Sequence, residues 1–318
     1  MTKYLLLLVK LGLSAGLIWY VFARIDFASA WTTLLSIPLT SIVVAIGLLL
    51  LQLVLGAYRV QELLAQLERR YRLPALIDAC WVGAFFSQTF ISFVGGDAMR
   101  IWRMIRSQIP AAAATQAILL DRIAGFAGVV VVLLVTIPFL VPILQSLEME
   151  IGLVLVAAGA LGFIVSIFVL RRLPAALQER RGVSVVARFA SRGLGIARSG
   201  RGAIFVLGLS IMIQVANVVI LFVLARGLSM EISLTQCLLF MPTVLFLSML
   251  PISIAGWGVR EGAMVTALAV IGVPSHQSLA LSICFGLCLV FVSLPGGIIW
   301  FTSRNKTLAA KEASALSN

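Results

Sequence analysis

The sequence has few charged residues: 11% of its 318 residues are Asp, Glu, Lys or Arg, against about 25% in soluble globular proteins. A chain that is 61% apolar has too little polar surface to cover itself, which excludes a soluble enzyme. The same composition excludes a disordered chain, a disulfide scaffold and a coiled coil. We therefore predict an all-α polytopic membrane protein, because backbone polar groups in lipid must be satisfied within helices.

Signatures of enzymes and cofactor sites are missing as well. There is no Gly-x-x-x-x-Gly-Lys-Ser/Thr loop, and the one histidine leaves no His-Glu-x-x-His centre. The four cysteines lie in apolar runs without metal-site spacing and are interpreted as packing residues. We expect no metal, no cofactor and no enzymatic activity, with an intramembrane enzyme as the least favoured alternative.

Long charge-free runs mark the expected membrane spans, because each exceeds the roughly 18 residues that a spanning helix needs. Six full transmembrane helices are predicted within 4–22, 27–58, 123–147, 151–170, 202–225 and 262–303. Ala28-Ser29-Ala30 resembles a signal-peptide cleavage site after a positive start at Lys3. Lys10 interrupts the apolar stretch, however, so we favour a retained first helix over removal of residues 1–30.

Basic residues predict the orientation of the chain. They gather in the segments 59–78 and 171–201 and in the tail 305–318, whereas the opposite loops hold two arginines. Lys and Arg collect in cytoplasmic loops, so we expect a cytoplasmic-membrane protein with both termini in the cytoplasm. This pattern also accounts for the net charge of +12 without a nucleic-acid partner.

The run 79–96 cannot be a full span, because the arginines on both sides of it are expected on the same face of the membrane. We predict a re-entrant hairpin that is broken at Gly95 and Gly96, where glycine tolerates the required backbone conformation. The run 232–259 repeats this pattern, with its break at Pro251 and at the glycines Gly256 and Gly258. The fold class is thus six full transmembrane helices plus two re-entrant broken hairpins.

The two hairpins also suggest an internal repeat. A shift of 161 residues places Ser92 on Ser253 and Gly95 on Gly256. Each half then holds an odd number of crossings, which predicts inverted repeats at about 1–145 and 150–304 within a single membrane domain, 1–318. Inverted repeats with paired broken segments are typical of transporters. Chance similarity between glycine-broken apolar runs is the alternative.

Charged residues follow both predicted breaks, although a charge inside the membrane is costly. Helix starts present free backbone N–H groups that favour anions. Two such starts facing each other would form a pocket for a lipid phosphate, with Trp257, Ser92 and Ser253 in its wall. The alternative is that the charges only pair, Arg100 with Glu261 or Asp121 with Arg122, to hold the hairpins. The candidate headgroup-binding residues are Asp97, Arg100, Asp121, Arg122, Arg260 and Glu261.

Three motifs carry a family resemblance: residues 90–100, Asp121-Arg122 and residues 251–262. Together they resemble the membrane domain of lysylphosphatidylglycerol synthases, the multiple peptide resistance factor family, and related stand-alone flippase-like proteins, over nearly the whole chain. In two-part members a soluble aminoacyltransferase domain follows, and the membrane domain moves the modified lipid. This chain ends soon after its last predicted helix, so the resemblance implies lipid translocation without the synthase. It leaves the lipid open, since some relatives are associated with hopanoids or glycolipid precursors.

We therefore expect a flippase that moves a lipid with a polar, phosphate-containing headgroup across the cytoplasmic membrane. The alternative is a non-transporting membrane protein that presents lipid to a separate synthase or glycosyltransferase. That alternative predicts a stable complex and no intrinsic flipping. The expected partners are a membrane lipid, a lipid-modifying enzyme and, in a homodimer, a second copy of the chain.

Overall fold

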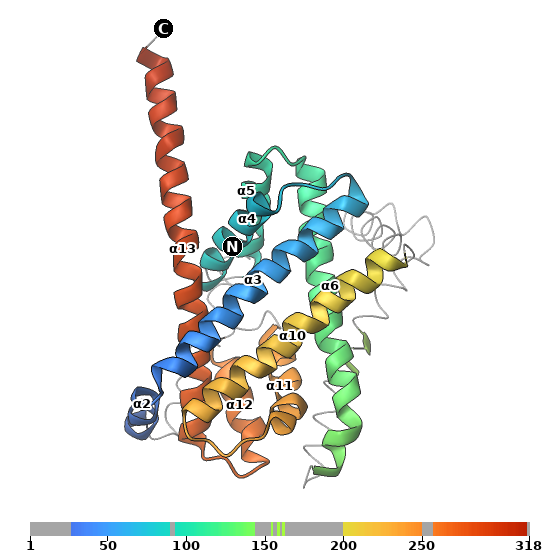
Figure 1. The fold of residues 1–318 in the computed structure, drawn as a ribbon, viewed down its shortest axis with the longest axis vertical. Coiled ribbons are helices and arrows are strands. Elements are labelled where there is room, and N and C mark those ends of the chain that lie inside the picture. The colour runs from blue at the N-terminus through green and yellow to red at the C-terminus, as the bar shows by residue number, and fades with distance from the viewer. Residues whose placement is uncertain are drawn as a thin grey trace, which may run out of the picture.

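The computed structural model describes residues 27–89, 93–143, 200–249 and 257–316, together with 154, 158, 159, 161 and 162. Within these ranges the chain is helical and contains no β-strand (Figure 1). The prediction of an all-α protein is confirmed for this part of the chain. The predicted spans within 4–22 and 151–170 lie outside the described ranges.

Within the described ranges, four helices are long and apolar enough to cross a membrane. They coincide with the charge-free runs 27–58, 123–147, 202–225 and 262–303, and they identify a multi-pass membrane protein. Three of them follow a proline, Pro38, Pro110 or Pro274, whose fixed φ suits a helix start. The four are α3 (Leu39–Leu67), α6 (Ala111–Leu140), α10 (Arg201–Gly227) and α13 (Ser275–Leu316).

Shorter helices form two consecutive pairs, and the members of each pair pack against each other. The first pair is α4 (Leu73–Thr89) and α5 (Phe93–Arg106), and the second is α11 (Leu234–Met249) and α12 (Val259–Ala269). The predicted break at Gly95 and Gly96 is corrected, because α5 already begins at Phe93 and both glycines lie in its first turn. The helix α4 ends at Thr89, and residues 90–92 lie outside the described ranges.

The long helices α3 and α10 lie side by side and run antiparallel (Figure 1). Gly202 at the start of α10 approaches Gln66 near the end of α3, and Gly227 at its end approaches Ser41. Between these points the Gln52 side-chain amide donates to the Ile213 carbonyl oxygen at 3.1 Å. Helix backbones approach closely where a small residue lies at the crossing.

The apolar side chains divide into two main buried clusters. One gathers residues of α10, α11 and α13, including Leu224, Cys237 and Leu281. The other gathers residues of α3, α4 and α6, such as Leu64 and Leu76. Large apolar side chains are also exposed along the long helices, as expected of surfaces that face lipid. A short helix, α2 (Phe27–Leu35), packs against α13.

Candidate functional site

Five charged side chains form a continuous chain of ion pairs, which we call the ion-pair ladder. Arg59 Nε contacts Asp121 Oδ1 at 2.7 Å, and Arg100 Nη1 contacts Asp121 Oδ2 at 2.9 Å. Arg100 Nη1 also lies 3.7 Å from Asp97 Oδ1, and Arg122 Nε contacts Asp97 Oδ2 at 2.6 Å. Three guanidinium groups thus alternate with two carboxylates, and the ladder carries one net positive charge.

Exposure rises along the ladder. The side chains of Arg59 and Asp121 are 10% and 5% exposed, whereas that of Arg122 is 36% exposed. Arg100 and Asp97 lie between these values. At the buried end, Arg59 and Asp121 neutralise each other. At the exposed end, Arg122 presents a guanidinium group that an anion can reach.

Three helices supply the ladder, and glycines make room for it. Arg59 lies on α3, Asp121 lies in the middle of α6, and Arg100 lies on α5. A Cβ atom at Gly83 of α4 would lie 2.6 Å from Arg100 Cδ. A Cβ atom at Gly125 would lie 3.4 Å from Arg59 Nη2. These glycines therefore permit guanidinium groups to pack directly against helix backbones.

Two buried atoms of the ladder have no hydrogen-bond partner: Arg100 Nε and Asp97 Oδ1. Buried polar atoms are normally paired. Arg100 also donates through Nη2 to Cys80 Sγ at 3.3 Å, a weak acceptor. One donor and one acceptor of the ladder thus remain for a polar ligand.

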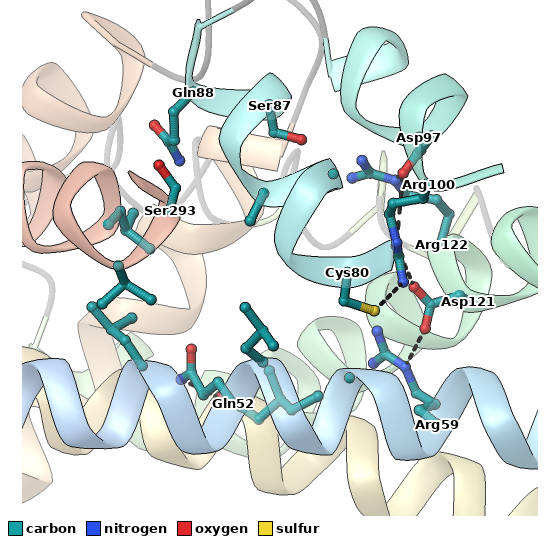
Figure 2. Close-up of a pocket in the computed structure, with 18 residues that line it drawn as sticks. Gln52, Arg59, Cys80, Ser87, Gln88, Asp97, Arg100, Asp121, Arg122 and Ser293 are labelled. Atoms are coloured by element: carbon teal, nitrogen blue, oxygen red, sulfur yellow. Dashed lines mark hydrogen bonds and ion pairs between the residues drawn. The ribbon is translucent and has the colours of Figure 1, made fainter. Parts of the chain in front are cut away.

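The ladder lines a cavity of about 290 Å³. Figure 2 shows the charged groups together on one side, with Gln88 and Ser293 across the cavity from them and Gln52 at its base on α3. Residues of α3, α4, α5, α6, α10 and α13 all contribute to the lining. Within the described ranges no group of three His, Cys, Asp or Glu side chains could hold a metal ion.

A second charged cluster lies on α12 and α13 and is closed. Arg260 and Glu261 are 5% and 4% exposed, and Arg260 Nη2 contacts Glu261 Oε1 at 2.7 Å. Ser282 donates to the same oxygen at 3.0 Å. The Arg260 guanidinium also lies 4.7 Å from the centre of the Trp257 ring. Gly258 caps α12 with φ of 86°, and its N–H donates to Glu261 Oε2 at 2.5 Å.

The structure separates the predicted site residues into these two groups. Asp97, Arg100, Asp121 and Arg122 line the cavity. The predicted pocket residues Arg260, Glu261 and Trp257 belong to the second cluster and are not part of the cavity lining. Gly96 does not break the helix but lets α5 pack closely against α4. A Cβ atom added at Gly96 would lie 2.7 Å from the Gly83 carbonyl oxygen. Ser92, Ser253 and Gly256 lie outside the described ranges.

The ion pairs differ from the two that the sequence suggested. Arg100 contacts Asp121 and not Glu261, which pairs with Arg260. Asp121 is held by Arg59 and Arg100, and Arg122 contacts Asp97.

Sequence reasoning missed Arg59, which was assigned to a cytoplasmic loop. The helix α3 continues through it to Leu67 and buries it. The spacing of Gln52, Gly56 and Arg59 could have indicated this, since residues at i, i+4 and i+7 share one helix face. All three line the cavity. Cys80, Gln88 and Ser293 had no comparable signal in the sequence.

The cavity gives Cys80 a distinct reactivity. It lines the cavity and is partly exposed, whereas Cys237, Cys284 and Cys288 are buried. A small water-soluble methanethiosulfonate should therefore add one label per chain, at Cys80, as measured by the mass of the intact protein. Cys80→Ser should remove the label. Equal labelling of wild type and Cys80→Ser would contradict the cavity described above.

The family model described as "Lysylphosphatidylglycerol synthase TM region" matches residues 7–296. No curated protein matches the chain. Because the match covers most of the sequence, the chain belongs to the family of the lysylphosphatidylglycerol synthase transmembrane region.

Proposed function

We propose that the protein is a lipid flippase of the cytoplasmic membrane, and that the cavity receives the phosphate-containing headgroup of a lipid. The single observation that carries this proposal is the ion-pair ladder in the wall of a polar cavity among membrane helices. The transmembrane family to which the chain belongs links it to lipid modification or translocation.

The ladder supports a headgroup site because its most accessible member is a guanidinium group. Arg122 is its most exposed member and shares Asp97 with Arg100. A phosphate can replace Asp97 as the partner of Arg122, since Arg binds both carboxylates and phosphates through paired N–H groups. In this role Asp97 positions the two arginines, and Asp121 anchors the ladder.

The cavity wall also suits an amphipathic ligand. Leu49, Leu53, Ile213 and Leu289 line it together with the polar groups. A headgroup would occupy the charged side while the acyl chains remain in the bilayer.

We further propose that the chain consists of two inverted repeats. The shift of 161 residues inferred from the sequence places α3 on α10, α4 on α11, α5 on α12 and α6 on α13, with bounds that agree within a few residues at most ends. Helix contacts are also repeated under this shift. Helix α4 packs on α13 in one contact, and their counterparts α11 and α6 pack on each other in another. Equivalent helices of two inverted repeats run in opposite directions across the membrane. The antiparallel contact of α3 with α10 agrees with this expectation.

The two charged clusters occupy equivalent places under the same shift. Asp121 corresponds to Ser282, and Arg100 corresponds to Glu261. Gly125 beside the Arg59 guanidinium corresponds to Gly286 beside the Arg260 guanidinium. The Arg260 cluster would thus be the counterpart of the ladder on the opposite side of the membrane, closed while the cavity is open.

Helix lengths support re-entrant hairpins. The longest helix of the two pairs, α4, has 17 residues, which span about 26 Å at 1.5 Å per residue. This falls short of the roughly 30 Å of the hydrocarbon core. Six full spans, two hairpins and cytoplasmic termini remain our proposal for the topology.

Removing the charge of Arg122 should slow lipid movement. In reconstituted vesicles, the wild type should expose fluorescent anionic phospholipid to an external quencher faster than empty vesicles do. Arg122→Gln should reduce the protein-dependent rate about tenfold, the effect of losing roughly 1.4 kcal/mol from one charge-assisted phosphate contact. Arg122 is the appropriate position because its exposure limits the cost to folding.

Arg226→Gln is the matched control, because Arg226 is exposed at the end of α10 and lies outside the cavity. It should flip lipid at the wild-type rate. If wild-type vesicles are no faster than empty ones across anionic phospholipids and glycolipids, the flippase proposal fails. Lipid-dependent binding of a synthase or glycosyltransferase under those conditions would then favour a lipid-presenting role.

A further inference from the structure

A second cavity, separate from the ladder, lies where two helix connections meet. It measures about 300 Å³ and is lined by the α3–α4 connection and the α5–α6 connection. Both connections lie at the same end of the helix bundle (Figure 1). Its charged residues are Arg69, Arg70 and Arg72, and Ser107, Gln108 and Ile109 face them. We call this cavity the basic pocket.

The arginines of the basic pocket are incompletely neutralised. Arg70 contacts Glu62 at 3.0 Å, and its side chain is 66% exposed. Arg69 stacks on Tyr71, with its guanidinium carbon 4.9 Å from the ring centre. Arg72 is exposed and makes no ion pair within the described ranges. The pocket thus retains a positive charge that its own side chains do not cancel.

Local contacts hold the pocket in shape. The Tyr71 hydroxyl donates to Glu68 at 2.7 Å. The Gln61 amide donates to the Tyr71 carbonyl oxygen at 2.7 Å. Contact with Tyr71 raises the pKa of Arg69, so that this guanidinium stays charged. On the facing side, Gln108 adopts φ of 63°.

The surroundings of the basic pocket favour a lipid over a soluble anion. It lies beyond the C-terminal ends of the helices α3 and α5. On the last turns of α5, Trp102 stacks with Arg106 at 4.9 Å, and Ile105 is 41% exposed. Tryptophan beside basic residues is typical of the membrane interface, where basic pockets bind anionic headgroups.

We propose that the basic pocket binds the phosphate headgroup of an anionic phospholipid from the adjacent leaflet, at a site distinct from the cavity of the ladder. The two connections that form it flank the α4–α5 pair, and Arg103 of α5 contacts Asp78 of α4 at 2.5 Å between them. A lipid bound there holds both ends of the helix pair that supplies Cys80, Gly83 and Arg100 to the cavity.

Lipid binding to the purified full-length chain tests this proposal. Native mass spectrometry with added phosphatidylglycerol should show a bound lipid that phosphatidylcholine does not replace. The double variant Arg69→Gln/Arg72→Gln should bind phosphatidylglycerol about tenfold more weakly, because each basic residue near a membrane surface contributes roughly 1 kcal/mol and part of this is screened. Both side chains are exposed, so the thermal unfolding midpoint should stay unchanged.

Two comparisons make the test specific. Arg226→Gln removes one exposed positive charge elsewhere and should bind as the wild type does. In an Arg122→Gln background the double substitution should still weaken binding about tenfold, which separates this site from the cavity. Two outcomes would overturn the proposal. One is unchanged phosphatidylglycerol binding by the double variant. The other is displacement of the lipid by millimolar inorganic phosphate, which would indicate a site for a soluble anion. The readout is bound lipid, so it does not depend on whether the protein flips lipid.

Discussion

Replacing Asp121 with Asn is expected to destabilise the folded protein by about 3–5 kcal/mol, the usual cost of breaking a buried ion pair on one side. Asp121 is 4% exposed and holds Arg59 and Arg100 through its two oxygens. An amide keeps the shape but loses the charge, and its NH₂ group would face a guanidinium donor. Unfolding by sodium dodecyl sulfate in mixed micelles measures the loss.

Two further variants show whether the loss comes from buried charge. Glu62→Gln breaks the pair with Arg70, which is 66% exposed, and should cost no more than about 1 kcal/mol. Adding Arg59→Met to Asp121→Asn should recover part of the stability, because one uncompensated charge is removed. Equal losses for Glu62→Gln and Asp121→Asn would show that the ladder is not a buried charge network.

Gly296→Ala is expected to destabilise the protein by about 2–3 kcal/mol through overpacking. The added Cβ would lie 2.6 Å from the Trp81 carbonyl carbon and 3.1 Å from the Val82 nitrogen. These are backbone atoms of α4 that cannot rotate away, so α4 and α13 would have to separate. The Trp81 indole also donates to the Val292 carbonyl oxygen at 2.8 Å across the same crossing. The same unfolding measurement in mixed micelles applies.

Gly47→Ala is the matched control, since a Cβ at Gly47 in α3 would have no atom within 4 Å. Alanine is favoured over glycine inside a helix by up to about 1 kcal/mol, so this variant should be as stable as the wild type or more so. A Gly296→Ala protein as stable as Gly47→Ala would contradict the close packing of α4 on α13.

The sequence predicted the long helices well because apolar runs determine membrane spans by themselves. It placed their ends less well. The charge-free run ended before Arg59, but α3 continues for two more turns, because Asp121 on another helix compensates that charge. A partner 62 residues away along the chain is a tertiary contact that local composition does not reveal.

The candidate site was predicted in part for a similar reason. Charges expected inside the membrane identified four residues of the ladder: Asp97, Arg100, Asp121 and Arg122. Gly96 was interpreted as a break, whereas the helix accommodates it and uses the missing side chain for contact with Gly83. Arg260 was expected at the cavity, but Glu261 and Ser282 enclose it with Trp257. The sequence shows which charged residues lie within the membrane region, but only the packing of the helices decides which of them line the cavity.

The odd number of charges in the ladder has an electrical consequence for the proposed transport. The five side chains of the ladder, three guanidinium groups and two carboxylates, sum to one positive charge, and a monoanionic headgroup would cancel it. A transmembrane voltage contributes about 2.3 kcal/mol per elementary charge per 100 mV. Voltage would therefore act on the return of the vacant carrier and leave the lipid-loaded step electroneutral.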